Sequence, residues 1–115
     1  MYDSDLDFYQ TQTRSTAMYP NVGRCSVIGL AYLGLGLGEA GEVQGKIKKV
    51  IRHDMGIVTD DKKREIVAEL GDVLWYVARI ADELRVPLSE IADSNLSKLK
   101  SRHDRGVIVG SGDNR

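Results

Sequence analysis

Residues 36–54 read GLGEAGEVQGKIKKVIRHD, and the structure of this stretch decides the fold. Its first six residues match G-x-G-x-x-G, the loop pattern of dinucleotide-binding folds, in which a strand precedes the loop and a helix and a second strand follow it. The second strand is missing here. The segment VQGKIKKVIRHD has the apolar spacing of a helix, and the only later β-like segment is residues 55–58. The context therefore argues against a dinucleotide-binding loop.

Helical periodicity accounts for the glycines better. At about 100° per residue, four of them share an arc of roughly 60°: Gly34, Gly38, Gly41 and Gly45. A separate apolar arc has the spacing of a buried helix face: Leu30, Leu33, Leu37, Ala40, Val43, Ile47 and Ile51. We therefore expect one long helix over residues 26–53. Each internal glycine costs up to about 1 kcal/mol relative to alanine, so we expect another helix, or a flat ligand, to approach this glycine stripe closely.

The composition fits a single domain spanning residues 1–115. The chain has 115 residues, of which 42% are hydrophobic and 29% are charged, enough for one modest core. A net charge of -1 gives no bulk attraction to nucleic acid or to a membrane surface. The single cysteine, Cys25, has no partner for an intrachain disulfide, and MYDSDLD does not resemble a secretory signal. The apolar run VIGLAYLGLGLG is too short to span a bilayer, so we expect a cytoplasmic protein.

The fold class predicted from these patterns is all-α, similar to a four-helix bundle. A second long amphipathic segment follows the helix-breaking residues MGIVTDD. Its apolar arc is well defined: Ile66, Leu70, Val73, Leu74, Val77, Ile80 and Leu84. Its opposite face aligns Glu65, Glu69, Asp72, Tyr76 and Glu83. The expected helices lie near residues 4–19, 26–53, 61–85 and 88–103, followed by a glycine-containing tail at about 104–115.

Two acidic pairs are candidate metal ligands. Glu39 and Glu42 lie three residues apart on one predicted helix, and Glu69 and Asp72 lie three apart on the next. Two antiparallel helices would bring all four carboxylates together, where they repel one another unless a cation is bound. Carboxylate oxygens suit Mg²⁺ or Mn²⁺, which also bridge substrate phosphates. The pattern therefore indicates a metal site that acts on a polyphosphate.

The rival carboxylate site is a di-iron centre in a helical bundle. Such a centre needs E-x-x-H on two helices, and neither His53 nor His103 stands in that pattern. Candidate phosphate contacts are basic residues near the acids, Lys46 and Lys49. A further polar face carries Asn95, Lys98, Arg102 and Arg105 along the last helix, and on spacing alone it is an ordinary solvated face.

The chain resembles the MazG-like all-α nucleoside triphosphate pyrophosphohydrolases, relatives of the helical dimeric dUTPases and the dCTP pyrophosphatases. Four segments carry the resemblance: FYQTQTRSTAMYP, GLGLGEAGEVQGKIKK, EIVAELGDVLWYVARIADEL and SNLSKLKSR. It implies Mg²⁺ ligands at Glu39, Glu42, Glu69 and Asp72. It implies hydrolysis of (deoxy)nucleoside triphosphates to a nucleoside monophosphate and pyrophosphate, as house-cleaning of the nucleotide pool. It also implies substrate contacts at Tyr76, Asn95, Lys98 and Arg102. Trp75 lies off the acidic face of its helix, so we expect a structural role for it, packed at a subunit contact.

One position departs from the family pattern. The first motif is often E-E-x-x-E, and Gly38 stands where its first glutamate would be. The general base is therefore unassigned, with Glu39 and Glu65 as candidates. The ending RGVIVGSGDNR resembles those of phage-type members, which suggests an ordered strap near the active site.

The resemblance implies a homodimer or a homotetramer with active sites close to the subunit interface. Short bundles of this kind expose apolar helix faces that one subunit does not cover. Two other functions remain open at this point: a helical regulatory module that binds a nucleotide or a metal without turnover, and a structural oligomerisation bundle.

Overall fold

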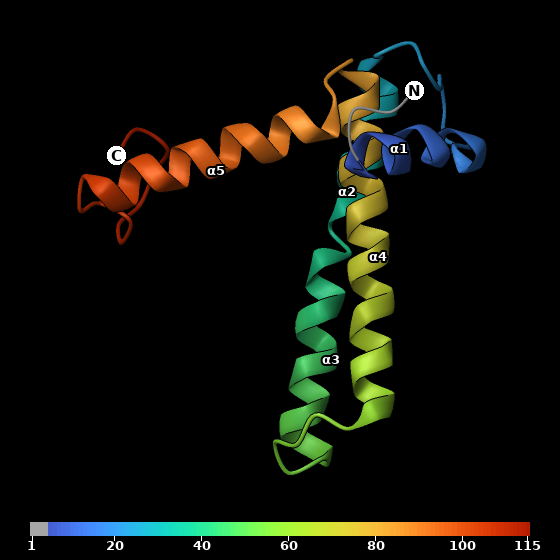
Figure 1. Ribbon diagram of the computed structural model, residues 1–115. Helices are drawn as coiled ribbons and strands as arrows, with labels where there is room; N and C mark the ends of the chain where they lie inside the picture. Colours follow the sequence, from blue (N-terminus) through green and yellow to red (C-terminus); the bar gives the residue numbers. More distant parts are fainter. Residues whose placement is uncertain (1–4) are drawn as a thin grey trace.

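The computed structural model describes residues 5–115 and is built from helices joined by short turns (Figure 1). In chain order the elements are α1 (Asp5–Gln12), the 3₁₀ helix η1 (Thr13–Thr16), α2 (Val27–Leu37), α3 (Ala40–His53), α4 (Asp60–Glu83) and α5 (Leu88–Asp104). Residues 5–115 contain no strand, which confirms the all-α prediction. The first residue of the predicted opening helix, Ser4, lies outside the described residues.

The prediction of one continuous helix over residues 26–53 is wrong, because the chain breaks between α2 and α3 (Figure 1). Around the break the backbone N–H groups of Gly38, Glu39, Gly41 and Glu42 donate to the carbonyl three residues earlier, at 2.8–3.1 Å. Bonds of this 3₁₀ type replace the α-helical ladder at helix ends. Glycines at alternate positions before the break weaken the intrinsic preference for a continuous helix. The break places Glu39 at the junction of two helices.

The helix α4 is the scaffold of the molecule. It begins at Thr59, whose hydroxyl accepts a hydrogen bond from the backbone N–H of Lys62 at 3.2 Å, and Asp60 and Asp61 occupy its first turn. Both features stabilise a helix N-terminus. The helix α3 runs beside the first half of α4, and α2 packs against its later part (Figure 1). This arrangement sets the junction between α2 and α3 against the middle of α4.

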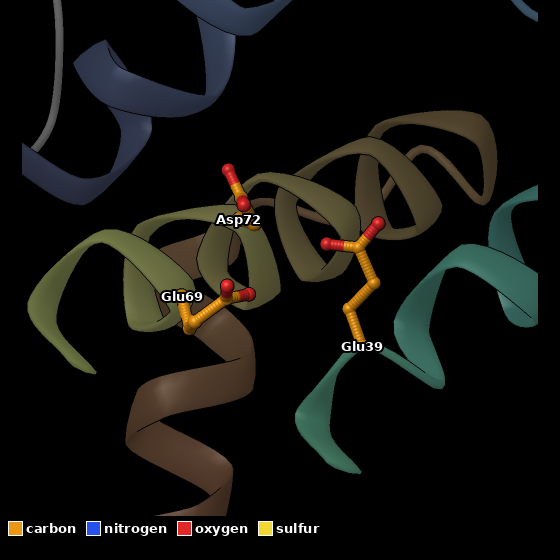
Figure 2. Close-up of side chains that lie close together, drawn as sticks. All are labelled: Glu39, Glu69 and Asp72. Carbon is orange, nitrogen blue, oxygen red and sulfur yellow. The ribbon is translucent and has the colours of Figure 1, made fainter. Parts of the chain in front are cut away.

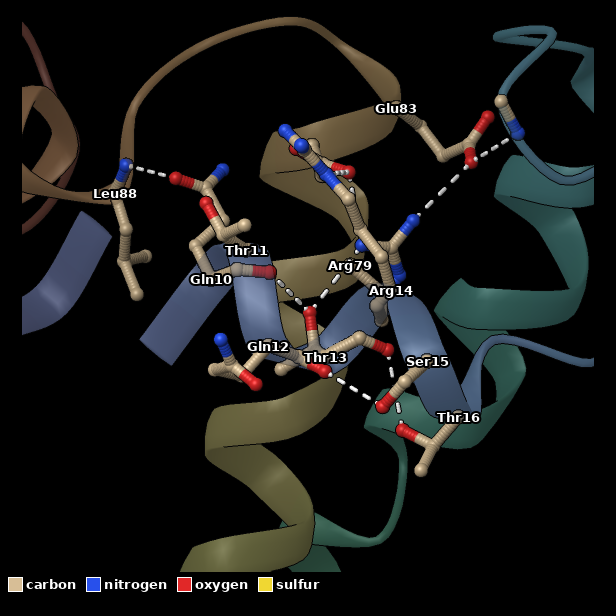
Figure 3. A network of polar contacts seen from close by, with 12 residues as sticks. Gln10, Thr11, Gln12, Thr13, Arg14, Ser15, Thr16, Arg79, Glu83 and Leu88 are labelled. Carbon is tan, nitrogen blue, oxygen red and sulfur yellow. Dashed lines mark hydrogen bonds and ion pairs between the residues drawn. The ribbon is translucent and has the colours of Figure 1, made fainter. Parts of the chain in front are cut away.

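The helix α1 holds the turn between α4 and α5. The Gln10 side chain donates to the carbonyl of Val86 at 2.9 Å and accepts from the N–H of Leu88 at 2.8 Å (Figure 3). The Asp7 carboxylate accepts from both the N–H and the hydroxyl of Ser89, at 3.0 and 2.7 Å. Asp7 therefore satisfies an amide at the start of α5 that the helix itself leaves unpaired.

The core of one chain is small. Its buried hydrophobic residues are Tyr19, Leu33, Val50, Ala78, Ala81 and Leu88. By contrast Ile51 is 69% exposed and Leu70 is 51% exposed, although both lie on predicted core faces. The radius of gyration is 17.0 Å, against about 13 Å for a compact domain of this length. One chain thus leaves apolar surface uncovered, and α5 projects away from the other helices (Figure 1).

Close approach occurs at other glycines than those predicted. A Cβ added at Gly34, Gly41 or Gly45 would meet no atom within 4 Å, and one added at Gly38 would meet only the Leu35 carbonyl of the preceding turn, at 3.0 Å. Within residues 5–115 no other helix therefore packs on this stripe. The glycines of α2 that other elements approach closely are instead Gly29, against the Pro20 carbonyl, and Gly36, against the ring of Tyr76. These two glycines lie on the face of α2 that carries the buried Leu33. None of the helices described is long and apolar enough to cross a membrane.

Candidate active site

Three of the four predicted metal ligands meet where the junction of α2 and α3 lies against α4 (Figure 2). One carboxylate oxygen from each of Glu39, Glu69 and Asp72 lies within 4.8 Å of the others, and we call these residues the acidic trio. Glu69 and Asp72 stand one turn apart on α4, and Glu39 reaches across from the junction. Within residues 5–115 no salt bridge and no hydrogen bond engages these carboxylates. Among the described residues, their charges therefore have no cationic partner.

The donor set of the acidic trio fits a hard divalent cation. Oxygens bound to Mg²⁺ at about 2.1 Å lie roughly 3 Å apart in adjacent positions and about 4 Å apart in opposite ones. The oxygens of the trio, within 4.8 Å of one another, lie close to this spacing. Three ligands leave further positions for phosphate oxygens and water. The fourth predicted ligand, Glu42, is exposed on the first turn of α3 and lies outside this group, so its role stays a prediction.

An aromatic cavity of about 200 Å³ adjoins the acidic trio. It is lined by Glu39, Asp72, Trp75 and Tyr76. The two rings meet edge to face, with centroids 5.1 Å apart and planes at 88°, and the Trp75 indole N–H donates to the Thr16 hydroxyl at 2.8 Å. Burial, followed by the charge of Glu39, raises the pKa of Tyr76 above its usual value, so its hydroxyl keeps its proton at neutral pH and can donate a hydrogen bond. The site thus places hydrogen-bonding and stacking groups beside clustered carboxylates.

Residues 30–107 match the MazG nucleotide pyrophosphohydrolase domain. The chain belongs to this family. It is also similar to the Gene 37 protein of Mycobacterium phage L5, with 52% identity over 112 residues that cover 96% of this chain and 98% of the relative. No solved structure matches. The matched range of the MazG domain contains the whole acidic trio and both cavity aromatics.

Trp75 lines the cavity beside the acidic trio, which its spacing in the sequence did not predict. We predicted a structural role, since Trp75 lies off the acidic face of its helix. Its hydrogen bond to Thr16 is structural, yet its ring also lines the cavity beside Glu39 and Asp72. The signal in the sequence was its adjacency to Tyr76, but the contact between the two rings depends on tertiary packing.

The second candidate base, Glu65, is engaged by lysines. The Lys62 ammonium lies 3.1 Å from its carboxylate. The hydrogen bond from Lys62, with the charges of Lys46 and Lys49 as smaller contributions, lowers the pKa of Glu65 below its usual range. A lowered pKa makes a carboxylate a weaker base at neutral pH. Glu65 also lies outside the acidic trio, whereas Glu39 belongs to it.

Within one chain the predicted polar face of the last helix does not reach the acidic trio. The helix α5 packs against α1 and the end of α4 and runs away from α3 (Figure 1). Asn95 and Lys98 line a separate cavity of about 350 Å³. Contacts of Asn95, Lys98 or Arg102 with a substrate at the trio therefore remain a prediction that requires a second chain.

The predicted strap folds back along α5, and within one chain it does not lie near the acidic trio, where we expected it (Figure 1). The buried guanidinium of Arg102 donates to the Asp113 carboxylate at 3.0 Å, and the Lys98 ammonium lies 3.4 Å from the same oxygen. Arg102 first, then Lys98, lowers the pKa of Asp113. Arg115 donates to the carbonyl of Val107 at 3.1 Å and closes the loop. Two predicted phosphate contacts are thus bound to a carboxylate of the strap.

Glu83 does not join the acidic trio, although its spacing predicts that it shares a helix face with Glu69 and Asp72. It belongs to a separate cluster of buried polar residues. It is 2% exposed, and its carboxylate accepts from the Tyr19 hydroxyl at 2.5 Å and from the N–H groups of Gly23 and Cys25 at 2.7 and 3.0 Å. The Arg79 guanidinium, also buried, donates to Tyr19 and to Asp82, each at 2.9 Å. It also lies 3.7 Å from the Glu83 carboxylate (Figure 3). This cluster fastens the segment between η1 and α2 onto α4. Spacing alone does not reveal it.

Proposed function

We propose that the acidic trio binds Mg²⁺, with Mn²⁺ as a substitute, and that this MazG domain hydrolyses (deoxy)nucleoside triphosphates to a nucleoside monophosphate and pyrophosphate. One observation carries the proposal: two carboxylates of α4 and one from the junction of α2 and α3 converge within 4.8 Å, with no cation of residues 5–115 to neutralise them. Membership of the MazG family supports the reaction class. The biological role that follows is house-cleaning of the nucleotide pool.

The residues of the trio and of the cavity divide the work. Glu39, Glu69 and Asp72 would hold the cation, which when bound neutralises phosphate charge and lowers the pKa of a coordinated water. Tyr76, one turn beyond Asp72, offers a neutral hydroxyl and a ring edge to the nucleoside. Because Asp72 and Tyr76 share a rigid helix, the phosphate and nucleoside ends of the substrate would be held in fixed relation. Glu39 remains a candidate base, and Glu65 a weaker one.

The remaining contacts are proposed to come from basic residues. Lys46 and Lys49 on α3 lie within electrostatic reach of Glu65, one turn along α4 from the trio, and would contact phosphate oxygens. Asn95, Lys98 and Arg102 would come from a second copy of the chain. The uncovered apolar residues of α5, Leu96 at 65% exposed and Leu99 at 38%, support such a homodimer or homotetramer. Light scattering tests the assembly, and a monomer at micromolar concentration would contradict it.

The activity is tested by measuring pyrophosphate release from a panel of ribonucleoside and deoxyribonucleoside triphosphates, with Mg²⁺ and with excess EDTA. The proposal expects equimolar nucleoside monophosphate and pyrophosphate with Mg²⁺, and no release in EDTA. Nucleotide binding without release would instead indicate a regulatory module. An assembly that neither binds nor hydrolyses any nucleotide would indicate a structural bundle.

A further inference from the structure

The ring of Tyr76 lies directly against the backbone of α2 at Gly36. A Cβ added to Gly36 would stand 2.8 Å from Cδ1 of the ring and closer still to its Cε1 and Cζ atoms, nearer than non-bonded carbon atoms pack. Gly34, two residues earlier on the same helix, faces open space. The contact therefore requires the missing side chain at Gly36 in particular, and it lets α2 approach α4 closely.

Gly36 is also hydrogen-bonded to Glu39, the member of the acidic trio that follows α2. Its carbonyl accepts a hydrogen bond from the backbone N–H of Glu39 at 2.9 Å, in the turn that ends α2. On the other side of the contact, Tyr76 stands one turn beyond Asp72 on α4. Gly36 thus links the position of Glu39 to the helix that carries Glu69 and Asp72.

The ring of Tyr76 also packs against its neighbour on α4. It meets Trp75 edge to face, and Trp75 is fastened to Thr16 by its indole N–H at 2.8 Å. Turning the ring would break its contact with Trp75, so we expect a methyl group at Gly36 to push α2 away from α4 instead. Glu39 would move with α2, because its N–H is bonded to the Gly36 carbonyl.

We propose that Gly36 is a positioning residue, which sets the separation of Glu39 from Glu69 and Asp72 by letting α2 rest on the Tyr76 ring. That this separation matters rests on the proposed function, in which all three carboxylates bind one divalent cation. The steric contact itself does not depend on that function. Gly36 touches neither substrate nor cation, and it acts through the spacing of two helices.

The test compares Gly36→Ala with the matched control Gly34→Ala, which makes the same change in the same helix without the contact. Two quantities are measured without nucleotide: the affinity for Mn²⁺, and the near-ultraviolet circular dichroism of Trp75, the single tryptophan. Gly36→Ala is expected to weaken Mn²⁺ binding at least about tenfold, as changes next to metal ligands do, and to alter the tryptophan signal while helix content is retained. Gly34→Ala is expected to match the parent in both.

A rescue experiment separates positioning from general damage. Tyr76→Ala removes the ring, so in that background Gly36→Ala is expected to change Mn²⁺ affinity by no more than about twofold. The proposal is overturned if Gly36→Ala binds Mn²⁺ like the parent with an unchanged Trp75 signal, if Gly34→Ala causes an equal loss, or if the loss persists without the ring. If the parent binds no Mn²⁺, the proposed function fails, and the Trp75 signals of the two glycine variants still decide whether Gly36 positions Tyr76.

Discussion

The helix α4 carries two groups of carboxylates with opposite surroundings. In its middle, Glu69 and Asp72 join Glu39 in the acidic trio, which no cation of residues 5–115 engages. Near its end, Asp82 and Glu83 are surrounded by donors, including the buried guanidinium of Arg79. The protein supplies its own positive charge where the carboxylates hold the fold together. Where we propose an external cation, no cation of residues 5–115 pairs with the clustered carboxylates.

Asp82 and Glu83, which we call the paired group, show how hydrogen bonds and charges offset the effect of burial on the pKa of a carboxyl group. Burial alone would raise the pKa of Glu83, but hydrogen bonds from Tyr19, Gly23 and Cys25 outweigh it, and the pKa is lowered overall. A hydrogen bond from Arg14 is the largest influence on Asp82, whose pKa is lowered as well. Both side chains therefore stay ionised at neutral pH and contribute to stability. We therefore expect substitutions in the acidic trio to lower activity but not stability, and substitutions of Asp82 or Glu83 to lower stability.

The largest effect is expected for activity in the acidic trio. Asp72→Asn or Glu69→Gln should lower pyrophosphate release at least about a thousandfold, equivalent to about 4 kcal/mol, because a metal ligand is lost. The free energy of unfolding in EDTA should be unchanged or slightly higher, since each substitution removes a repelling charge. Steady-state kinetics and denaturant titrations measure the two quantities. Parent-like turnover in either variant would remove that residue from the site.

The opposite result is expected for the paired group. Glu83→Gln should lower the free energy of unfolding by about 3 to 5 kcal/mol, because it leaves the buried Arg79 charge undercompensated. Glu90→Gln is the matched control, an exposed carboxylate for which no ion pair is found within residues 5–115, and it should change stability by less than about 0.5 kcal/mol. Equal effects of the two substitutions in denaturant titrations would contradict a structural role for the Glu83 cluster.

A smaller effect is expected for the basic face of α5. Lys98→Ala should lower kcat/KM about ten- to a hundredfold, or about 1.5 to 3 kcal/mol, and leave Mn²⁺ affinity unchanged, because it removes a phosphate contact and no metal ligand. The control is Lys100→Ala, an exposed lysine of the same helix that pairs with Asp104 at 2.8 Å. If Lys98→Ala and Arg102→Ala both have parent-like kinetics, α5 is only a solvated face, and the triphosphate must be held by Lys46, Lys49 or the arginines of the tail.

The smallest effect concerns pH. Because the pKa values of Asp82 and Glu83 are lowered in the folded state, their stabilisation is fully present above the usual carboxyl pKa of about 4 and is lost as the pH falls through their folded values. The unfolding free energy should therefore decrease on acidification below about pH 4. Denaturant titrations at fixed protein concentration over a pH series measure this slope. Asp82→Asn should make it shallower, and an unchanged slope would exclude Asp82 as a contributor.

Regular helices were predictable from the sequence, and their interruption was not. The predicted segments 61–85 and 88–103 agree closely with α4 and α5, because a long amphipathic repeat leaves few alternatives. The break between α2 and α3 could not be predicted in this way, because the apolar spacing of residues 26–53 continues across it. It accompanies local 3₁₀ bonding and the contact of Gly36 with Tyr76, a residue 40 positions away in the chain.

The candidate site was predictable as far as helical spacing determines neighbours. Glu69 and Asp72 had to lie one turn apart, and a helix pair could bring Glu39 to them. The burial of Glu83 depends on the segment before α2, where Asn21, Gly23 and Cys25 take positive φ values that no periodic pattern encodes. Periodicity also marks Leu96 as apolar without deciding whether its own chain or a second copy covers it.

The central claim is that the acidic trio holds a divalent cation which the protein does not replace with a charge of its own. Calorimetric titration of Mn²⁺ into the nucleotide-free parent, Asp72→Asn and Glu90→Gln tests it most directly. We predict saturable binding to the parent, equal binding to Glu90→Gln, and at least about tenfold weaker binding to Asp72→Asn. Equal Mn²⁺ affinity in the parent and Asp72→Asn, or no saturable binding to the parent, would contradict the claim.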